Sequence, residues 1–457
     1  MTAPLLLLQT AAERLDAARQ GLDIPLHERL VGVIGIAVMI ALAVLLSYDR
    51  RRINWRLVGT GLLIQLAFGL LVLKTGPGRA FFDAIGAVIT GLLGFTTEGA
   101  RFVFGNLVGS TVPVGVPGPG GAVAAGETVA FTGAYFAFTV LPTIIFFSSL
   151  MSVLCYLGVM QVIVKAIAWG MQKTLGTSGA ETLSASGNIF LGQTEAPLLI
   201  KPFVGSMTKS ELVTVMVGGF ATVAGGVLAA YVGMLAGVFP NIAGHLLAAS
   251  VMNAPAGLYL SKIIMPETEE PVTRGSLPSD FAKADSSVIE AAANGAGQGA
   301  ILAINVAAML IAFVALVALL NFGLGWIGGF AGMPDLSLQT ILCQLLRPLA
   351  WTMGVPWHDT AYVGGLVGIK TVLNEFVAYA QFATDLGAGQ ALEPRSAIIL
   401  TYALLGFANF SSIAIQIGGI GGIAPERRSE LARFGLRAMI AGNLAAFTSA
   451  CIAGMFA

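Results

Sequence analysis

The amino-acid sequence predicts an all-α polytopic membrane protein in which two re-entrant hairpins form an inverted repeat. The first observation is composition, because 56% of the 457 residues are hydrophobic and only 11% are charged, with a mean hydropathy of +0.84. Soluble domains carry about 25% charged residues, so this deficit fits several membrane spans. The second observation is that two polar stretches, Gly187–Ile200 and Lys370–Phe382, interrupt the apolar segments. Within a bilayer, broken polar backbone is tolerated only where it is buried in protein or lines a wet cavity.

The same composition argues against several other classes of protein. The formal net charge is zero and the chain has no long basic run, so nucleic acid is not an expected partner. The cysteines, Cys155, Cys343 and Cys451, lie far apart in apolar segments and predict neither a disulfide framework nor a zinc site. The sequence shows no His/Cys/Asp cluster and no nucleophile motif, so we do not expect an enzyme.

The chain begins with two expected spans joined by a basic loop. The spans cover about residues 30–47 and 55–72, and Asp49-Arg50-Arg51-Arg52 lies between them. Lys and Arg are enriched in cytoplasmic loops, so we place this loop in the cytoplasm and the N-terminus outside. Residues 77–126 are less hydrophobic, and we interpret them as interfacial segments with an external loop before a third span at about 131–159.

The first polar stretch is too short to cross a membrane twice. About 20 apolar residues are needed for one crossing, and the segment Leu183–Phe203 has Lys173 before it and Lys201 near its end. It should therefore enter and leave on the cytoplasmic side as a re-entrant hairpin, with its tip near Gln193-Thr194-Glu195. The next span, Leu212–Val238, is interrupted at Thr222, Gly225 and Gly226.

The second half of the chain repeats this plan. A polar hairpin containing Asn374-Glu375 is followed by a span with the string Gly406-Phe407-Ala408-Asn409, which matches Gly219-Phe220-Ala221-Thr222 in the first half. Counting crossings from an outside N-terminus places the two hairpins on opposite faces of the membrane, so the halves are inverted. Paired interrupted segments in two inverted halves indicate a transporter site near the bilayer midplane.

These features divide the chain into seven expected parts. In order they are an N-terminal leader or interfacial segment (1–27), three spans with interfacial helices (28–178), the first hairpin with a broken fourth span and a fifth span (179–265), a cytoplasmic linker (266–286), a long helix with an interfacial segment (287–357), the second hairpin with a broken seventh span (358–425), and a last span (426–457). The linker assignment rests on its polar, mixed-charge composition.

Glu195 and Glu375 need a reason to lie within the membrane. An ionisable group there costs roughly 2.5–3.5 kcal/mol on insertion scales. Each glutamate could simply pair with a lysine or cap a half-helix. Each glutamate also has other hydrogen-bond donors and acceptors near it in the sequence or in the following span. These are Gln193 and Thr194 in the first half, Asn374 in the second, and Thr222, Asn409, Ser411 and Ser412 in the spans opposite. Such groups bind sugar hydroxyls and base edges, and Phe407 offers an apolar or stacking wall.

A cation site is also possible in the first half. Broken helices expose carbonyl oxygens that ligate hard ions such as sodium. Asn188, with the carbonyls of Leu191, Thr222 and Val223, would supply an oxygen set of this kind. An isolated asparagine in an apolar run otherwise serves as a helix cap or an interhelical hydrogen bond. The residues alone leave sodium and protons open as the coupling ion. A channel is the less favoured alternative, since filters use rings of like groups.

These motifs resemble those of the concentrative nucleoside transporter family. The resemblance rests on the run from Gly187 to Leu198, on Asn374-Glu375-Phe376-Val377-Ala378-Tyr379, and on Gly406-Phe407-Ala408-Asn409-Phe410-Ser411-Ser412. It covers most of residues 30–457, including the Glu290–Gly295 start of the long helix. It implies eight transmembrane helices, two opposed hairpins, a homotrimer, and a scaffold within which a transport part moves by an elevator-type mechanism.

The resemblance also assigns roles by motif. It implies import of nucleosides, uridine and related compounds among them, driven by a sodium gradient across a bacterial inner membrane, with proton coupling as the alternative. Sodium is favoured because the Gly-Gln-Thr-Glu form and Asn188 are both kept. Gln193, Thr194, Glu195 and Val227 would contact the nucleobase, Glu375, Asn409 and Ser412 the ribose, and Phe407 would line the pocket. Asn188, Leu191, Thr222 and Val223 would hold the sodium ion.

Overall fold

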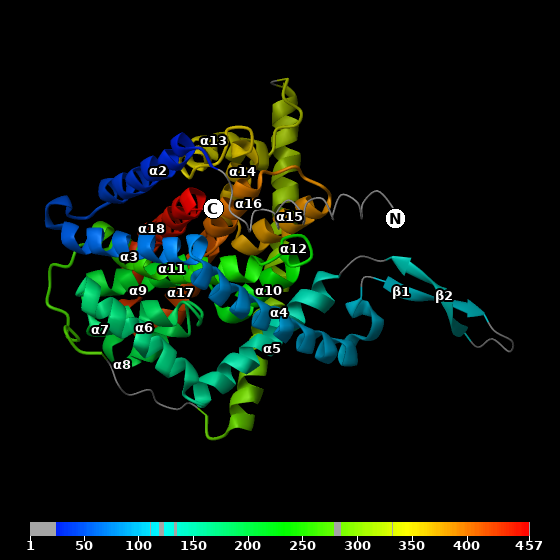
Figure 1. The fold of residues 1–457 in the computed structure, drawn as a ribbon, viewed down its shortest axis with the longest axis horizontal. Coiled ribbons are helices and arrows are strands. Elements are labelled where there is room, and N and C mark those ends of the chain that lie inside the picture. The colour runs from blue at the N-terminus through cyan, green and yellow to red at the C-terminus, as the bar shows by residue number, and fades with distance from the viewer. Residues whose placement is uncertain are drawn as a thin grey trace.

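A computed structural model describes residues 24–109, 111–117, 123–131, 135–277, 285–330 and 332–456. Most of the predicted N-terminal leader lies outside the described residues, as does part of the predicted linker 266–286. The described chain is almost entirely helical (Figure 1). The prediction of a helical membrane protein with several apolar helices is therefore confirmed.

Seven helical stretches in the described residues are long and apolar enough to cross a membrane. They are Leu26–Leu45, Trp55–Lys74, Gly76–Val108, Phe136–Tyr156, Lys209–Leu235, Val288–Phe330 and Pro425–Phe456. The eight expected spans are not the same set, because the predicted fifth and seventh spans are absent from these stretches and the segment from Gly76 is present. The number of crossings therefore stays a prediction.

The first part of the chain forms three consecutive helices. Helix α2 covers Leu26–Leu45 and α3 covers Trp55–Lys74, with the short 3-10 helix η2 (Arg50–Arg52) in the basic loop between them. Asn54 starts α3, because its side chain accepts a hydrogen bond from the Leu57 N–H, as preferred N-cap residues do. The two predicted spans are thus observed as helices.

The region predicted as interfacial segments and an external loop is more regular than expected. Helix α4 runs without interruption over Gly76–Phe104 and continues into η3, Gly105–Val108. Strands β1 (Thr111–Pro117) and β2 (Val123–Phe131) then pair antiparallel in a two-stranded sheet. Where we predicted a loop, these two runs satisfy their backbone hydrogen-bonding groups by pairing with each other, so the all-α description is amended by one β-hairpin.

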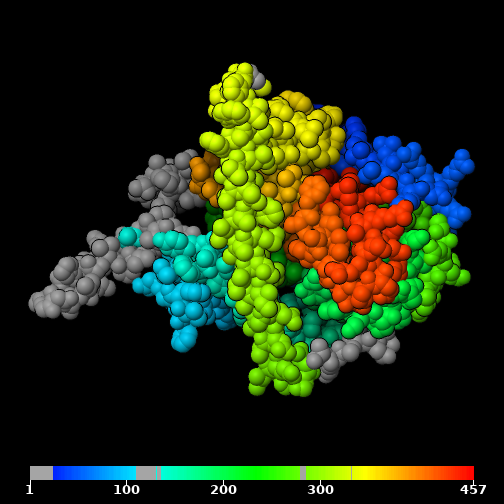
Figure 2. All heavy atoms as spheres, turned by 180° about the vertical axis from the view of Figure 1, so that it is seen from behind, coloured from blue at the N-terminus to red at the C-terminus, as the bar shows by residue number. Residues whose placement is uncertain are grey.

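A long helix borders the molecule on one side. Helix α12 covers Val288–Phe330, 43 residues, which at about 1.5 Å per residue is far longer than the roughly 30 Å hydrocarbon core of a bilayer. It packs along α5 (Phe136–Tyr156), and Figure 2 shows it extending over the full height of this face. The close contact depends on Gly299, since a Cβ there would lie 2.8 Å from the Ile145 Cα.

The first predicted hairpin consists of short helices around an irregular tip. After α6 (Val159–Leu175), helix α7 covers Gly179–Gly187 and the chain returns through η5 (Ala196–Ile200) and α8 (Lys201–Val204). The tip between α7 and η5 contains the predicted Gln193-Thr194-Glu195. The chain therefore turns back where the sequence indicated.

The predicted fourth span is broken. Helix α9 covers Lys209–Ala221 and α10 covers Gly225–Leu235, with Thr222 at the break. Helix α11 (Ile242–Ile264) follows and packs on α9.

The second half repeats a hairpin and a broken helix. After α13 (Leu338–Thr352), helix α14 (Thr360–Val372) turns at Leu373-Asn374 into α15 (Glu375–Gly387). The broken pair is α16 (Pro394–Leu404) and α17 (Phe410–Ile423). Both features lie where the sequence predicted them.

The last helix begins earlier than expected. A short 3-10 helix, η6 (Pro425–Arg427), leads into α18, which covers Arg428–Phe456. Within the predicted part 426–457, the basic stretch from Glu426 to Arg437 predicts a cytoplasmic loop ahead of a span at about 438–456. From Arg428 on, these residues instead form the first turns of α18. Basic residues are typical of loops beside a membrane. Arg, Glu and Leu are also strong helix formers, so this basic segment is helical.

The helices fall into an inner and an outer set. In the most apolar window of α9–α10, 89% of residues are buried, and in that of α18 the share is 83%. The corresponding shares are 17% for α12, 22% for α5 and 28% for α2. Because the outer helices expose apolar side chains while α9, α10 and α18 are enclosed by protein, the first broken helix lies in the protein core and the outer set is suited to face lipid.

Candidate functional site

The two helix breaks contact each other. The Phe407 N–H donates to the Thr222 carbonyl with an N···O distance of 3.3 Å. Gly406 has a φ of +114°, and a Cβ there would lie 2.7 Å from the Phe220 carbonyl oxygen. Only glycine allows this backbone conformation and this close approach. The Gly-Phe-Ala strings that predicted the two breaks therefore meet in space.

Glu375 lies beside this contact and is only 3% exposed. The Tyr231 hydroxyl donates to its Oε1 at 3.0 Å, and Asn409 Nδ2 donates to its Oε2 at 2.8 Å. Asn374 caps α15 by accepting from the Val377 N–H at 2.9 Å, which places Glu375 at the first position of the helix. One carboxylate therefore joins α10, α15 and the start of α17.

The alternative roles of Glu375 were to pair with a lysine or to cap a half-helix, and among the described residues the structure shows neither a hydrogen bond to a lysine nor a cap from this side chain. The buried Lys370 donates to the carbonyls of Ala403 and Leu405, at 3.0 and 3.4 Å, and not to Glu375. The helix cap is supplied by Asn374. The carboxylate is thus held by neutral donors, which leaves lone pairs for a ligand.

Asn409 serves both the helix and the site. Its Oδ1 accepts from the Ser412 N–H at 2.9 Å and from the Ser411 hydroxyl at 2.7 Å, which caps α17. Its Nδ2 is then directed to Glu375. The Asn-Phe-Ser-Ser spacing therefore aligns three predicted polar residues at one helix start.

The first hairpin reaches the same place through Gln193, which is 7% exposed. Gln193 Nε2 donates to Ser412 Oγ at 3.4 Å, and Gln416 Nε2 donates to Gln193 Oε1 at 3.1 Å. A Cβ at Gly219 would lie 2.9 Å from the Gln193 Cβ, so glycine in α9 admits the hairpin tip. The structure brings together polar residues from both halves.

The other predicted base-contacting residues take different positions. Val227 is 2% exposed, whereas Thr194 and Phe407 are half-buried. Thr194 packs against α17, where a Cβ on Gly419 would lie 2.6 Å from its Cγ2. Glu195 is exposed, with its carboxylate folded back over Gly192. The two hairpin glutamates, treated alike at the sequence level, differ in burial because only Glu375 lies between the helix breaks.

Asn188 is the predicted cation ligand, and its amide is fully buried. Neither Oδ1 nor Nδ2 has a hydrogen-bond partner in the protein. It therefore makes neither the side-chain cap nor the interhelical hydrogen bond that were its alternatives. A buried unpaired amide costs roughly 1–3 kcal/mol by mutational data, so this side chain is suited to meet a ligand.

The other members of the predicted cation set surround the same break. Thr222 Oγ1 donates to the Gly218 carbonyl at 2.8 Å, and Val223 is 1% exposed. The Gly225 N–H donates to the Phe190 carbonyl at 2.8 Å, which ties the hairpin tip beside Leu191 to the break. Among the described residues, no group of three His, Cys, Asp or Glu side chains is placed to hold a metal ion, so oxygen ligands of this kind are the candidates.

Sequence reasoning missed Tyr231 and Gln416. Both are fully buried in apolar helices. A polar side chain within an apolar run is itself a signal, and Gln416 stands alone between isoleucines in α17. That signal would have selected Gln416. Tyr231 carries a weaker one, since tyrosine is also an ordinary core residue.

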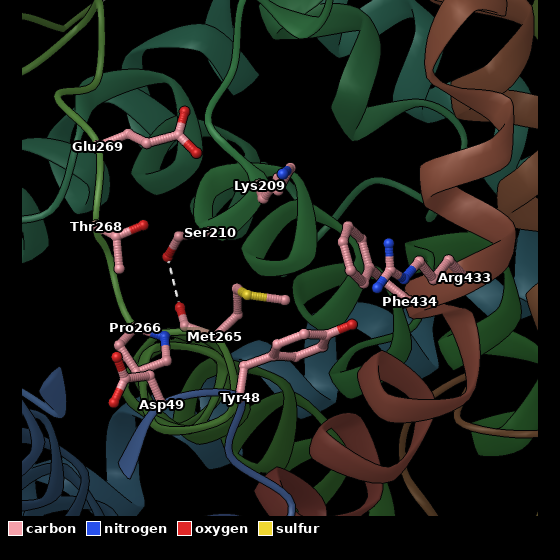
Figure 3. A pocket seen from close by; sticks show the side chains of 10 residues that line it. All are labelled: Tyr48, Asp49, Lys209, Ser210, Met265, Pro266, Thr268, Glu269, Arg433 and Phe434. Atoms are coloured by element: carbon pink, nitrogen blue, oxygen red, sulfur yellow. Dashed lines mark hydrogen bonds between the residues drawn. The ribbon is translucent and has the colours of Figure 1, made fainter. Parts of the chain in front are cut away.

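A separate cavity of about 230 Å³ lies away from these residues (Figure 3). It is lined by the α2–α3 loop, the start of α9, the chain after α11 and part of α18, and it contains both signs of charge, from Lys209, Arg433, Asp49 and Glu269. Ser210 hydrogen-bonds the Met265 carbonyl at its wall, at 2.6 Å. None of the predicted site residues lines it.

Paired broken helices and hairpins around a buried polar site are the architecture of secondary transporters, and this is the class of protein that the fold and the site define. Comparisons with known proteins agree. The chain matches the Na+ dependent nucleoside transporter N-terminus over residues 34–107, the nucleoside recognition (Gate) family over 137–238, and the Na+ dependent nucleoside transporter C-terminus over 245–454.

Individual proteins are similar over most of the chain. An uncharacterized transporter of Haemophilus influenzae is 45% identical over 93% of this chain and 97% of its own length. Sodium/nucleoside cotransporter 1 of Mus musculus is 43% identical over 94% of this chain, which spans 64% of that protein. The structure of CNTnw in an inward-facing substrate-bound state is 46% identical, with a TM-score of 0.83, over 93% of this chain and 97% of that one.

The chain therefore belongs to the Na+-dependent, or concentrative, nucleoside transporter family, and it is a multi-pass membrane protein.

Proposed function

We propose that this protein is a secondary active symporter that imports nucleosides, uridine among them, using a sodium gradient. The observation that carries the proposal is that a fully buried, unpartnered amide at Asn188 and a buried carboxylate network at Glu375 flank the same pair of contacting helix breaks. An ion and a polar solute that bind on either side of one structural element are well placed to depend on each other.

The nucleoside would lie between the two hairpin tips. Glu375, Asn409 and Ser412 would hold the ribose, because a carboxylate, an amide and a hydroxyl match sugar hydroxyls as acceptors and donors. The base would be contacted from the first hairpin and α10, by Gln193, Thr194, Glu195 and Val227. Phe407 would line the pocket beside the α16–α17 break. Exposed Glu195 would reach the base only after the hairpin tip closes on the ligand.

The sodium ion would replace the missing partner of Asn188. Sodium prefers oxygen ligands, and Asn188 Oδ1, the Thr222 hydroxyl or carbonyl, and the carbonyls of Leu191 and Val223 would provide them. The Phe407 N–H already occupies one lone pair of the Thr222 carbonyl, and a carbonyl oxygen has two. The ion would therefore strengthen the contact between the two breaks.

Coupling would follow from the shortness of the first hairpin tip. Asn188 and Gln193 lie five residues apart on either side of Phe190, whose carbonyl is bonded to the Gly225 N–H. Sodium bound at Asn188 would order this tip and hold Gln193 ready for the base. Because coupling free energies are reciprocal, the nucleoside would raise the affinity for sodium equally.

The movement that carries the site across the membrane is proposed to be of elevator type. The re-entrant hairpins and inner helices would form the moving part, with eight spans in total and with α5 and α12 as scaffold. CNTnw, the related protein, is described in inward-facing, intermediate and outward-facing states, which supports alternating access for this family. A homotrimer in the bacterial inner membrane, with the N-terminus outside, completes the proposal.

Uptake into liposomes tests the function directly. Purified protein is reconstituted, and radiolabelled uridine is added with an inward sodium gradient, with a proton gradient alone, or with neither. We expect accumulation above the external concentration only with sodium. Accumulation driven by protons alone would replace sodium coupling by proton coupling. Equilibration without accumulation under every gradient would indicate a channel instead of a symporter.

A further inference from the structure

Gln416 is a fully buried glutamine in α17 that lies behind the site. Its Nε2 is 3.1 Å from the Met216 carbonyl oxygen and 3.1 Å from Gln193 Oε1. The side chain therefore connects the backbone of α9 to the tip of the first hairpin. No role was assigned to it by the motifs or by the network around Glu375.

The Met216 contact determines which way both amides point. A backbone carbonyl only accepts hydrogen bonds, so the group of Gln416 that faces Met216 has to be its NH2. The second proton of that NH2 then goes to Gln193, whose facing atom has to be the carbonyl oxygen. The O and N atoms of a side-chain amide are otherwise difficult to tell apart. Here the Met216 carbonyl can only accept, so it fixes the orientation of Gln416 and, through it, that of Gln193.

The consequence is that Gln193 presents its own NH2 on the opposite side. That group lies 3.4 Å from Ser412 Oγ, so the order of donation runs from Gln416 to Gln193 to Ser412. The Gln193 amide has one N–H beyond the Ser412 bond, and it offers this N–H to whatever occupies the site. The serine, having accepted, retains its own proton to donate.

We propose that Gln416 determines base selectivity by locking the Gln193 amide with its N–H toward the base. The inference rests on the proposed nucleoside function. In this arrangement Gln193 reads the 4-position of a pyrimidine or the 6-position of a purine, and it favours a carbonyl oxygen there over an amino group. Uridine and inosine carry the carbonyl, whereas cytidine and adenosine carry the amino group. With cytidine or adenosine, the Gln193 N–H would face the amino group of the base, and two such donors would leave buried hydrogen-bonding groups unpaired.

Two substitutions of Gln416 separate this role from simple packing. Gln416→Leu removes the lock and lets the Gln193 amide rotate. Gln416→Glu keeps the shape but reverses the polarity toward Gln193. The oxygen that replaces Nε2 carries the one proton of a buried neutral carboxyl group and donates it in a hydrogen bond to the Met216 carbonyl, so the same oxygen can only accept from the Gln193 NH2. Gln193 would be turned so that its oxygen faces the base.

The experiment measures sodium-driven uptake of uridine, cytidine, inosine and adenosine in liposomes, with KM and maximal rate determined for each. We expect the unsubstituted protein to favour uridine over cytidine, and inosine over adenosine, in KM by about tenfold. Gln416→Leu should bring both ratios close to one, and Gln416→Glu should invert them. Gln390→Glu, at an exposed glutamine outside the site, is the matched control and should keep the original ratios.

Protein folding is monitored by the thermal transition in detergent and by the sodium dependence of uptake. A merely structural role for Gln416 would lower the maximal rate for all four nucleosides and leave the KM ratios unchanged, and that result would overturn the proposal. If the unsubstituted protein takes up no nucleoside at all, the proposed function fails independently of this inference.

Discussion

At the scale of single residues, the buried polar side chains of this protein divide into satisfied and unsatisfied groups. Glu375 is satisfied by Tyr231 and Asn409, whereas Asn188 has no partner for either amide atom. Buried polar groups are hydrogen-bonded in the great majority of native structures. The exception at Asn188 is therefore a functional signal, while the network at Glu375 is a preformed site.

The charge of Glu375 should be essential for binding. Replacing it in Glu375→Gln removes a charged acceptor, and hydrogen bonds to charged groups contribute about 1.5–3 kcal/mol each. We expect sodium-driven uridine uptake to fall by at least about tenfold, with the thermal transition retained. Glu393→Gln, at a partly exposed glutamate that contacts His358, is the control. Normal uptake by the Glu375 variant would remove this residue from the site.

Sodium should raise the thermal stability of the protein only when Asn188 is present. In sodium-free buffer, Asn188→Ala removes an unsatisfied buried amide and should leave thermal stability unchanged or raise it. In sodium, the unsubstituted protein should be stabilised by mass action, and the variant should not be. Thermal transitions in sodium chloride and in choline chloride measure this at equal ionic strength. Equal stabilisation of both proteins by sodium would contradict the assignment.

At the scale of elements, the breaks and caps decide where helices stop. The sequences Ser178-Gly-Ala-Glu181 and Thr208-Lys-Ser-Glu211 form capping boxes that begin α7 and α9, as the S/T-x-x-E pattern predicts. The Ser178 hydroxyl also donates to Glu211, so the two helix starts are joined. The hairpin and the broken helix are thus fixed together at their bases and in contact at Phe190.

The base of the first hairpin depends on Lys262. Its Nζ lies 2.7 Å from Glu181 and 3.2 Å from Glu267, and the side chain is 6% exposed. Lys262→Met leaves buried carboxylates without their cation, which typically costs 3–5 kcal/mol. We expect a clearly lowered thermal transition in detergent.

Two further variants make the Lys262 test specific. Lys173→Met, at an exposed lysine, should have little effect because surface charges contribute little. Adding Glu181→Gln to Lys262→Met should recover part of the loss, since the charge left behind is neutralised. Additive losses in the double variant would show that the two side chains do not interact.

The contact between the two breaks should not tolerate a side chain. Gly406→Ala places a Cβ 2.7 Å from the Phe220 carbonyl and requires a φ of +114°, so the breaks have to separate. We expect lower thermal stability and loss of uptake. Gly418→Ala in α17, where a Cβ meets nothing within 4 Å, should be neutral or stabilising by up to about 1 kcal/mol. Full uptake by the Gly406 variant would show that the contact is dispensable.

At the scale of the whole molecule, the outer helices carry the apolar surface. Helix α12 exposes large side chains along its length, such as Ile304 at 68%, Ile311 at 73% and Phe322 at 77%. In a membrane these atoms meet lipid or another subunit. Contiguous exposed apolar surface marks a membrane or a protein contact, so the outer set is the expected place for both.

The proposed homotrimer has a direct measurement. Light scattering in detergent, corrected for the bound detergent, should give a protein mass of three times 47.1 kDa. Dilution over a wide range of protein concentration controls for non-specific association. A mass equal to that of one chain at every concentration would contradict the trimer.

Local sequence signals predicted much of this arrangement because they act locally. Composition identified the membrane class, and the paired Gly-Phe-Ala strings located both breaks. The extent of α4, the β-hairpin and the early start of α18 were not foreseen. There the choice between helix, strand and loop depends on long-range packing, which a window of residues does not contain.

What the sequence by itself determined is which residue types occur and where regular structure is interrupted: Asn188, Gln193, Glu375 and Asn409 all lie at predicted interruptions. Only the tertiary structure decided that Glu375 is buried while Glu195 is exposed, that Tyr231 and Gln416 complete the network, and that Asn188 has no partner. The physical reason is that burial and hydrogen bonding are properties of pairs of residues far apart along the chain, 223 positions apart for Gln193 and Gln416, whereas helix breaks and caps arise among neighbours along the chain.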